Sequence, residues 1–202
     1  MSEHFITKDG KARCKWCGIT PEFINYHDKE WGFPVSDDQR LFEKLCLESF
    51  QSGLSWRTIL AKRENFRKAF KHFDFNKVAR YTERDITRLL QDEGIVRHRG
   101  KIEAVINNAK CARELVKQEG SLAAFFWHFE PEASNLTTPQ TVSTSDESIA
   151  LSKALKKMGW KFVGPTTAYA FMQAMGLVND HVNGCVIRNK VERARNKFKR
   201  PK

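Results

Sequence analysis

One long stretch of the chain repeats apolar residues at intervals of three and four positions. Between residues 102 and 116 they are Ile102, Val105, Ile106, Ala109, Ala112, Leu115 and Val116. This spacing gathers apolar side chains on one face of a helix, and other elements must cover that face. No segment of the sequence shows the strict alternation of a half-buried strand, and no internal repeat is present. The sequence therefore predicts an all-α fold.

Further helices are expected where similar spacing follows a capping residue. They cover residues 21–27, 38–48, 56–70, 82–94, 122–129, 147–158 and 165–175. Residues 130–144, rich in Thr, Ser and Pro, are expected to form a surface loop. A chain of 202 residues is long enough to bury a core. We expect a flexible arm at residues 1–11, one domain of two helical lobes at residues 12–187, and a basic, mobile tail at residues 188–202.

The overall charge limits the class of partner. The chain carries a net charge of +11 with a pI of about 9.6, and such a field attracts polyanions, nucleic acid first among them. A basic protein without such a partner is the alternative. No apolar run is long enough to span a membrane, and the polar N-terminus is not a secretory signal. Five cysteines in such a chain favour metal ligands or free thiols over disulfides, and hence a reducing compartment.

Two widely separated motifs contain residues suited to bind a metal. Cys14 and Cys17 have the spacing of a metal knuckle, with His27 beyond them, while His181 and Cys185 lie one helical turn apart near the other end of the domain. Together they offer nitrogen and sulfur ligands for a closed zinc site that would join the first segment to the last. Five candidates compete for four places, and composition does not decide among them. The alternative is a set of core cysteines and surface histidines.

A carboxylate and an aromatic ring are held close together in the first half of the chain. Glu48 continues the apolar face of its helix, where a carboxylate is costly unless another group pairs with it. The chain then turns at Ser52 and Gly53, and Trp56 returns towards Glu48. The alternative is an exposed glutamate beside a tryptophan of the core.

A helix, a short turn and a second helix near residue 164 form a pattern suited to a DNA phosphate. Gly164 permits a close backbone approach, and the second helix presents unpaired N–H groups at its positive end. Lys161, Thr166 and Thr167 are placed to add side-chain contacts, which hold a phosphate without recognising a base. A helical hairpin that binds nothing is the alternative. A second basic cluster with weaker specificity consists of Arg97, His98, Arg99 and Lys101.

Several motifs together resemble one family of DNA-repair enzymes. They are Arg13–Trp16, Tyr26–Pro34, Leu47–Trp56, Gly94–Ile102, Leu151–Lys157 with Phe162–Gly164, and Gly176–His181. Over roughly residues 12–187 the sequence is similar to the family of bacterial DNA-3-methyladenine glycosylase I.

The resemblance implies a helix-hairpin-helix DNA glycosylase fold with one structural Zn²⁺ per chain. The implied zinc ligands are Cys14, His27, His181 and Cys185. The implied pocket for an alkylated adenine consists of Trp16, Phe23, Tyr26, Trp31, Glu48 and Trp56. Cys17 is then the surplus thiol. Phe23 stands where the family often has Tyr, and Phe50 replaces a polar residue, which is expected to alter the DNA-facing surface.

The implied activity is base-excision repair, in which the enzyme flips 3-methyladenine out of double-stranded DNA and removes it by hydrolysis. The lesion is a cation that aromatic faces attract, and Glu48 can accept hydrogen bonds from the adenine edge, so little acid catalysis is required. No lysine is obviously placed for a Schiff base, so we expect a monofunctional enzyme without strand cleavage. Asp180 is the second candidate for the catalytic group, although its place beside a zinc ligand favours a structural role.

We expect this enzyme to act as a monomer in the bacterial cytoplasm, associated with the nucleoid through DNA and with no membrane partner. The competing hypothesis is a zinc-stapled DNA-binding module without catalysis. That hypothesis explains the charge, the hairpin and the metal ligands, but it does not explain Glu48 among aromatic residues.

Overall fold

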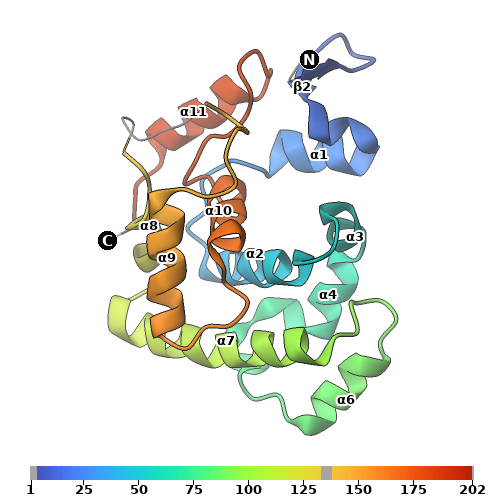
Figure 1. Cartoon of the computed structure of the whole chain (residues 1–202), viewed down its shortest axis with the longest axis vertical. Coiled ribbons are helices and arrows are strands. Elements are labelled where there is room, and N and C mark those ends of the chain that lie inside the picture. The colour runs from blue at the N-terminus through green and yellow to red at the C-terminus, as the bar shows by residue number, and fades with distance from the viewer. Residues whose placement is uncertain (1–3, 133–137, 202) are drawn as a thin grey trace.

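Helices make up nearly all of the regular structure in the computed structural model, which describes residues 4–132 and 138–201 (Figure 1). The α-helices are α1 (Pro21–Lys29), α2 (Asp38–Gln51), α3 (Trp56–Ala61), α4 (Arg63–Ala69), α5 (Phe75–Val78), α6 (Glu83–Gln91), α7 (Arg99–Glu119), α8 (Leu122–Trp127), α9 (Asp146–Lys157), α10 (Pro165–Ala174) and α11 (Arg188–Lys197). They are accompanied by the 3₁₀ helices η1 (Lys15–Ile19) and η2 (Lys71–Phe73) and by the strands β1 (His4–Ile6) and β2 (Ala12–Cys14). The prediction of an all-α fold is confirmed.

Three parts of the predicted arm, loop and tail, residues 1–3, 133–137 and 202, lie outside the described residues. Within the described ranges, no helix combines the length and the apolar character needed to cross a membrane.

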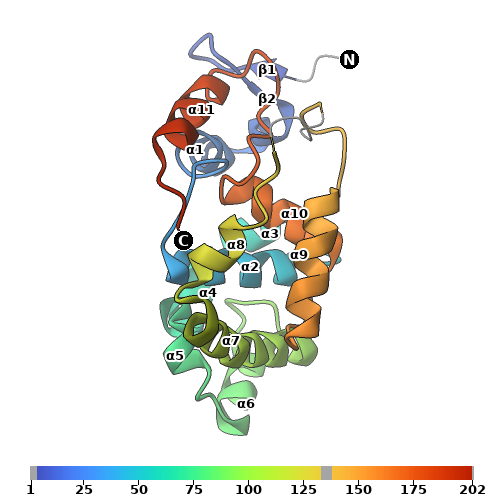
Figure 2. The same ribbon diagram turned by 90° about the vertical axis from the view of Figure 1, so that its left-hand side faces the viewer.

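Helix α2 lies at the centre of the molecule against α10, between α1 and α11 at one end and α6 and α7 at the other (Figures 1 and 2). Every side chain from Lys44 to Phe50 is buried, so this part of α2 is covered on all sides rather than along one stripe. Phe50 packs against Phe66 of α4 with ring centroids 4.6 Å apart. The expectation that Phe50 alters a DNA-facing surface is therefore wrong, because the helix that contains it has no exposed face at this point.

The N-terminal hairpin and the segment that leads into α11 lie at the same end of the molecule (Figures 1 and 2). Strand β1 pairs antiparallel with β2 in a short hairpin, where a flexible arm was expected. The backbone N–H of Val186 donates to the carbonyl of Ala12 at 2.9 Å, which joins the C-terminal segment to this hairpin.

The first part of the basic tail predicted to be mobile, residues 188–202, forms the helix α11. Val191 is fully buried. The buried guanidinium of Arg195 donates to the carbonyl of Gly176 and, at 2.8 Å, to the carboxylate of Glu130. Helix α11 is held in place by Val191 and by the paired Arg195. With so few buried apolar residues, its sequence shows no periodic apolar pattern.

The helix expected over residues 56–70 is divided into two. Helix α3 ends at Ala61 and α4 begins at Arg63, with Lys62 between them at φ −96° and ψ 1°. The change of direction brings Phe66 of α4 and its C-cap residue Phe70 against Phe50. The polar sequence around the break contains no proline or glycine, so it gave no local sign of this division.

Gly176 allows the connection between α1 and α2 to pack against the end of α10. Its φ is +83°, and an added Cβ would lie 2.6 Å from backbone atoms of Phe33 and Pro34. We predict that Gly176→Ala lowers the free energy of unfolding by at least about 2 kcal/mol, because strain and a backbone clash add together. This corresponds to a fall in melting temperature of roughly 4–8 °C for a chain of this size.

Gly120 provides the matched control, since its φ is +81° but an added Cβ would meet nothing within 4 Å. Gly120→Ala should cost only about 1 kcal/mol from backbone strain. Equal losses in the two variants, measured by thermal denaturation, would show that the contact with Phe33 and Pro34 is unimportant.

Candidate functional site: an aromatic pocket beside a cysteine–histidine cluster

A pocket of about 370 Å³ opens between α1, the end of α2 and the start of α3. All the predicted pocket residues line it: Trp16, Phe23, Tyr26, Trp31, Glu48 and Trp56. The structure thus brings together side chains from η1, α1, the α1–α2 connection, α2 and α3.

Trp16 is the central ring of one wall of this pocket. Its ring centroid lies 5.0 Å from that of Trp31 and 5.9 Å from that of Phe23, in edge-to-face geometry. On the other side, the rings of Tyr26 and Trp56 are 5.4 Å apart. Such edge-to-face contacts hold the rings rigidly and leave faces available to a planar ligand.

The turn that follows α2 returns Trp56 to Glu48, as the sequence predicted. Gly53 supplies the positive φ of +77° that this turn requires. Ser55 then caps α3 by accepting a hydrogen bond from the N–H of Thr58 at 3.2 Å. Glu48 is 6% exposed. Because it lines the pocket, it is the acidic group that a ligand there would meet.

Lys44 is a residue beside the pocket that the sequence analysis did not single out. Its Nζ lies 2.7 Å from Glu48 Oε1, donates to the hydroxyl of Tyr26 at 2.7 Å, and sits 3.4 Å from the ring centroid of Trp56. Burial lowers the pKa of Lys44, and the charge and hydrogen bond of Glu48 partly oppose this effect. The spacing of four residues between Lys44 and Glu48 on one helix was the available sign of this ion pair.

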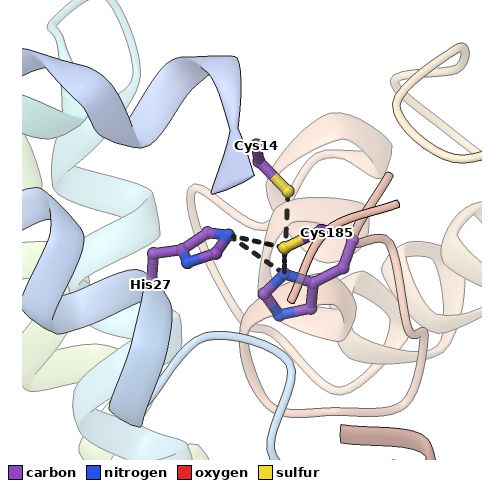
Figure 3. Close-up of side chains that lie close together, drawn as sticks. Cys14, His27 and Cys185 are labelled. Carbon is purple, nitrogen blue, oxygen red and sulfur yellow. Dashed lines mark hydrogen bonds between the residues drawn. The ribbon is translucent and has the colours of Figure 1, made fainter. Parts of the chain in front are cut away.

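A second constellation lies directly behind the pocket. The ligand atoms of Cys14, His27, His181 and Cys185 all lie within 4.8 Å of one another, and all four residues are buried. Figure 3 shows the side chains of Cys14, His27 and Cys185 converging from separate parts of the chain. His27 Nε2 is 3.1 Å from His181 Nδ1 and 3.5 Å from Cys185 Sγ.

The outer contacts of the two histidines decide which ring nitrogens face the centre of the cluster. His27 Nδ1 lies 2.8 Å from the carboxylate of Asp28, and His181 Nε2 lies 3.0 Å from the carbonyl of Trp31. Both partners only accept hydrogen bonds, so these outer nitrogens hold the protons. Neutral His27 and His181 then point two lone pairs at each other across 3.1 Å. Two facing lone pairs and two sulfurs fit a bound cation.

Charges around the cluster support the same arrangement. The guanidinium of Arg13 donates to Asp28 at 2.8 Å and to Asp9 at 2.9 Å, which keeps Asp28 in position to orient His27. A hydrogen bond from Cys14 holds the pKa of the Cys185 thiol well below its usual range, with smaller contributions from His181 and His27. A thiolate at this position is the form that binds metal.

Cys17 lies outside the cluster, although it is fully buried. Burial raises the pKa of its thiol to about 12. Its sulfur is not among the ligand atoms that gather in the cluster, which agrees with its prediction as the surplus cysteine.

The turn between α9 and α10 has a backbone held in place by side chains. Asn108 accepts a hydrogen bond from the N–H of Lys161 at 2.8 Å, and the hydroxyl of Ser152 donates to the carbonyl of Val163 at 2.7 Å. Lys161 and Thr166 are exposed, and Gly164 is the N-cap residue of α10 without a side-chain cap. Thr167 is half-buried. The four predicted DNA contacts therefore lie on one short, rigid surface.

The sequence profile of the methyladenine glycosylase family matches residues 16–189 of this chain, which include the pocket and all but one residue of the cluster. The chain belongs to the methyladenine glycosylase family. This confirms the resemblance predicted from the motifs and makes the chain a glycosylase. Helix α11 lies almost entirely beyond the matched residues.

Individual relatives extend over the same part of the chain. DNA-3-methyladenine glycosylase 1 of Escherichia coli (strain K12) is 52% identical over 177 residues, which cover 86% of this chain and 95% of the relative. DNA-3-methyladenine glycosylase of Haemophilus influenzae is 50% identical over 178 residues, covering 86% of this chain and 96% of the relative.

Solved structures of this family have the same fold. A crystal structure of 3-methyladenine DNA glycosylase I matches with a TM-score of 0.80 at 49% identity, over 86% of this chain and 98% of that one. The enzyme from Staphylococcus aureus, whose structure addresses recognition of 3-methyladenine, matches with a TM-score of 0.80 at 38% identity, over 84% of this chain and 93% of that one.

One basic residue near the end of α2 was expected to act differently. Lys101, assigned to a basic cluster, is buried, and its ammonium donates to the carbonyls of Phe50 at 2.9 Å and of Ser52. That ammonium stabilises the C-terminal end of α2 and is not free to meet a phosphate. The prediction for Lys101 is therefore wrong.

Asp180 supports the pocket from behind rather than lining it. It accepts hydrogen bonds from the backbone N–H of Gln140 at 2.9 Å and from the side chain of Gln173 at 2.6 Å. Gln140 and Gln173, which the sequence analysis did not single out, do line the pocket. Burial raises the pKa of Asp180. These contacts favour the structural role over the catalytic one.

We predict that Cys185→Ala loses a tightly bound metal ion and lowers thermal stability, because it removes one ligand of a closed four-residue site. Elemental analysis of the purified protein and its melting temperature with and without a chelator are the measurements. Cys17→Ser is the matched control and should retain the metal. Full metal content in Cys185→Ala, or its loss in Cys17→Ser, is incompatible with this ligand set.

Proposed function

We propose that this protein is a base-excision-repair glycosylase that flips 3-methyladenine out of double-stranded DNA and removes it by hydrolysis, without cutting the strand. The observation that supports this most strongly is the position of Glu48 among the rings of the pocket. Solved relatives point the same way: one structure is a tyrosine-to-phenylalanine variant of 3-methyladenine DNA glycosylase I in complex with 3-methyladenine. That variant matches this chain with a TM-score of 0.79 at 38% identity.

The pocket suits a flipped, positively charged base. N3-methylated adenine in DNA is a cation, and the faces of Trp16, Tyr26 and Trp56 attract a cation by about 0.5–2 kcal/mol per good contact. Glu48 is placed to accept hydrogen bonds from the adenine edge. Phe23 takes part as an apolar wall without a hydroxyl.

The reaction needs little help from an acid. The bond between the base and C1′ of the sugar breaks, its electron pair moves to the base, and the cationic base leaves as a neutral molecule. A water molecule then bonds to C1′ and releases a proton. The enzyme accelerates this step if it binds the bond-breaking state more tightly than the intact nucleotide.

Lys44 is the lysine nearest to the pocket rings, and its contacts argue against a Schiff base. Its nitrogen is enclosed by Glu48, Tyr26 and Trp56, and its side chain does not line the pocket. These three partners keep the nitrogen of Lys44 away from a nucleotide in the pocket. This supports a monofunctional enzyme.

DNA docking is assigned to the turn before α10 and to the loop before α3. The N-terminus of α10, with Gly164, Lys161 and Thr166, is suited to a phosphate of the backbone. Leu54, 42% exposed, stands on the loop between Glu48 and Trp56, where an apolar side chain can fill the space that a flipped base leaves.

The metal is proposed to be one structural Zn²⁺ per chain, held by Cys14, His27, His181 and Cys185. Two sulfurs and two imidazole nitrogens are a ligand set that Zn²⁺ prefers, and four protein ligands leave no place for substrate. The metal would contribute stability by joining β2, α1 and the segment before α11.

The same proposal describes a monomer that works at DNA in the bacterial cytoplasm. The relatives from Escherichia coli and Haemophilus influenzae and the free state of all five cysteines support it. A zinc-stapled DNA-binding module without catalysis remains the alternative. Release of free 3-methyladenine from methylated duplex DNA by the purified protein separates the two.

We predict that Glu48→Gln reduces excision of 3-methyladenine by at least about 100-fold, or ~2.7 kcal/mol in the barrier, because the charge that complements the base is lost. Affinity for undamaged duplex should be nearly unchanged. Glu43→Gln is the matched control, since Glu43 also lies on α2 but pairs with Arg67 at 2.7 Å and does not line the pocket. Normal excision by folded Glu48→Gln would refute the assignment.

We predict that Gly164→Ala keeps its stability but binds duplex DNA several-fold more weakly, whatever base is present. An added Cβ meets nothing within 4 Å inside the protein, so it affects only what approaches from outside. Lys161→Ala should instead reduce the salt dependence of binding by about one ion. If Gly164→Ala binds duplex DNA as tightly as the parental protein, the turn is not the docking element.

A further inference from the structure

The ammonium of Lys44 has a complete set of partners immediately behind the base pocket. Its three N–H groups are matched by the Glu48 carboxylate, the Tyr26 hydroxyl and the face of Trp56, at 2.7, 2.7 and 3.4 Å. Lys44 is 5% exposed. These three partners are also three of the residues that line the pocket. An ammonium with three fitted partners is held in one position.

Neighbouring charges do not compete for Glu48. The other ion pairs near Lys44 do not involve Glu48, because Arg63 pairs with Glu30 at 2.7 Å and Arg67 pairs with Glu43 at 2.7 Å. Among the described residues that line the pocket, Glu48 is the one carboxylate. The carboxylate that lines the pocket and the ammonium behind it therefore carry one negative and one positive charge, and this ion pair is neutral.

This neutrality matters because the charge of the base changes during the proposed reaction. The bound lesion is a cation, while the departing base is neutral. A pocket with an unpaired carboxylate would hold the intact cationic lesion most tightly and would resist the loss of its charge. A fixed positive charge beside that carboxylate weakens the preference for the cation and favours movement of the electron pair onto the base.

We propose, building on the proposed function, that Lys44 is a positioning residue that sets the charge selectivity of the base pocket by neutralising Glu48. It holds Glu48 and Trp56 in place and limits how strongly the pocket prefers a cationic base to a neutral one. Binding energy is thereby reserved for the bond-breaking state.

The test compares two small ligands of nearly the same shape and different charge. The fixed cation 3,9-dimethyladeninium represents the lesion, and 3-methyladenine, uncharged at mildly alkaline pH, represents the product. Quenching of tryptophan fluorescence reports binding, because Trp16, Trp31 and Trp56 line the pocket. The ratio of the two affinities is the measured quantity. Both ligands bind the same folded fraction, so loss of stability in a variant cancels from this ratio.

We expect Lys44→Met to raise the preference for the cation by about tenfold or more, or ~1.4 kcal/mol. In excision assays it should lower both KM and kcat, as expected when the intact lesion is held more tightly. Lys44→Arg, which keeps the charge, should remain near the parental ratio. Lys117→Met is the matched control, because Lys117 forms an exposed pair with Glu114 at 2.8 Å.

An unchanged affinity ratio in Lys44→Met overturns the inference, and so does an equal shift in Lys44→Arg. If Lys44→Met does not fold, Lys44→Gln, which retains a donor for Glu48 and Tyr26, decides the question by the same ratio. A parental protein that binds neither ligand and excises nothing would contradict the proposed function itself, so the two failures are distinguishable.

Discussion

The arrangement of the pocket depends on the buried contact between the two ends of the domain. Cys14 and His181 are 167 positions apart in sequence, yet Cys14 Sγ lies 3.6 Å from His181 Nδ1. The segment that contains Cys14 and His27 also contains Trp16 and Phe23, which belong to one wall of the pocket. Joining this segment to the residues before α11 places that wall against the end of α2. The cluster residues do not line the pocket, but they determine where its aromatic rings stand.

Helix α2 places a charged group, the carboxylate of Glu48, inside a buried site. A carboxylate enclosed by aromatic rings is costly unless another group compensates its charge, and Lys44 does so from the preceding turn of the same helix. The same ion pair then affects what the pocket prefers to bind. The Lys44–Glu48 ion pair thus affects both the stability of the helix and the selectivity of the site.

Other polar residues around the pocket and the cluster form pairs, so few buried charges in the described part of the protein lack a partner. Arg13 with Asp28, Asp180 with Gln173, and Lys101 with the end of α2 each satisfy a buried polar group. Each also fixes a functional neighbour: His27, the pocket wall, or the turn that leads to Trp56. Exposed groups are found where DNA is proposed to dock, at Lys161, Thr166 and Leu54.

The sequence by itself determined the helical class and the metal-binding residue types, because these depend on local spacing and on chemistry that few residue types provide. The aromatic pocket residues followed from the resemblance of the sequence to a known family. It did not reveal Lys44 as the partner of Glu48, since a lysine on a helix is usually solvated and only the packing of Tyr26 and Trp56 encloses this one. The sequence also failed to predict the helix α11 and the burial of Phe50. Burial of Arg195 depends on Glu130, and burial of Phe50 depends on α4, and neither partner is near in sequence. Tertiary structure decides such cases because the cost of burying a group depends on which distant residues surround it.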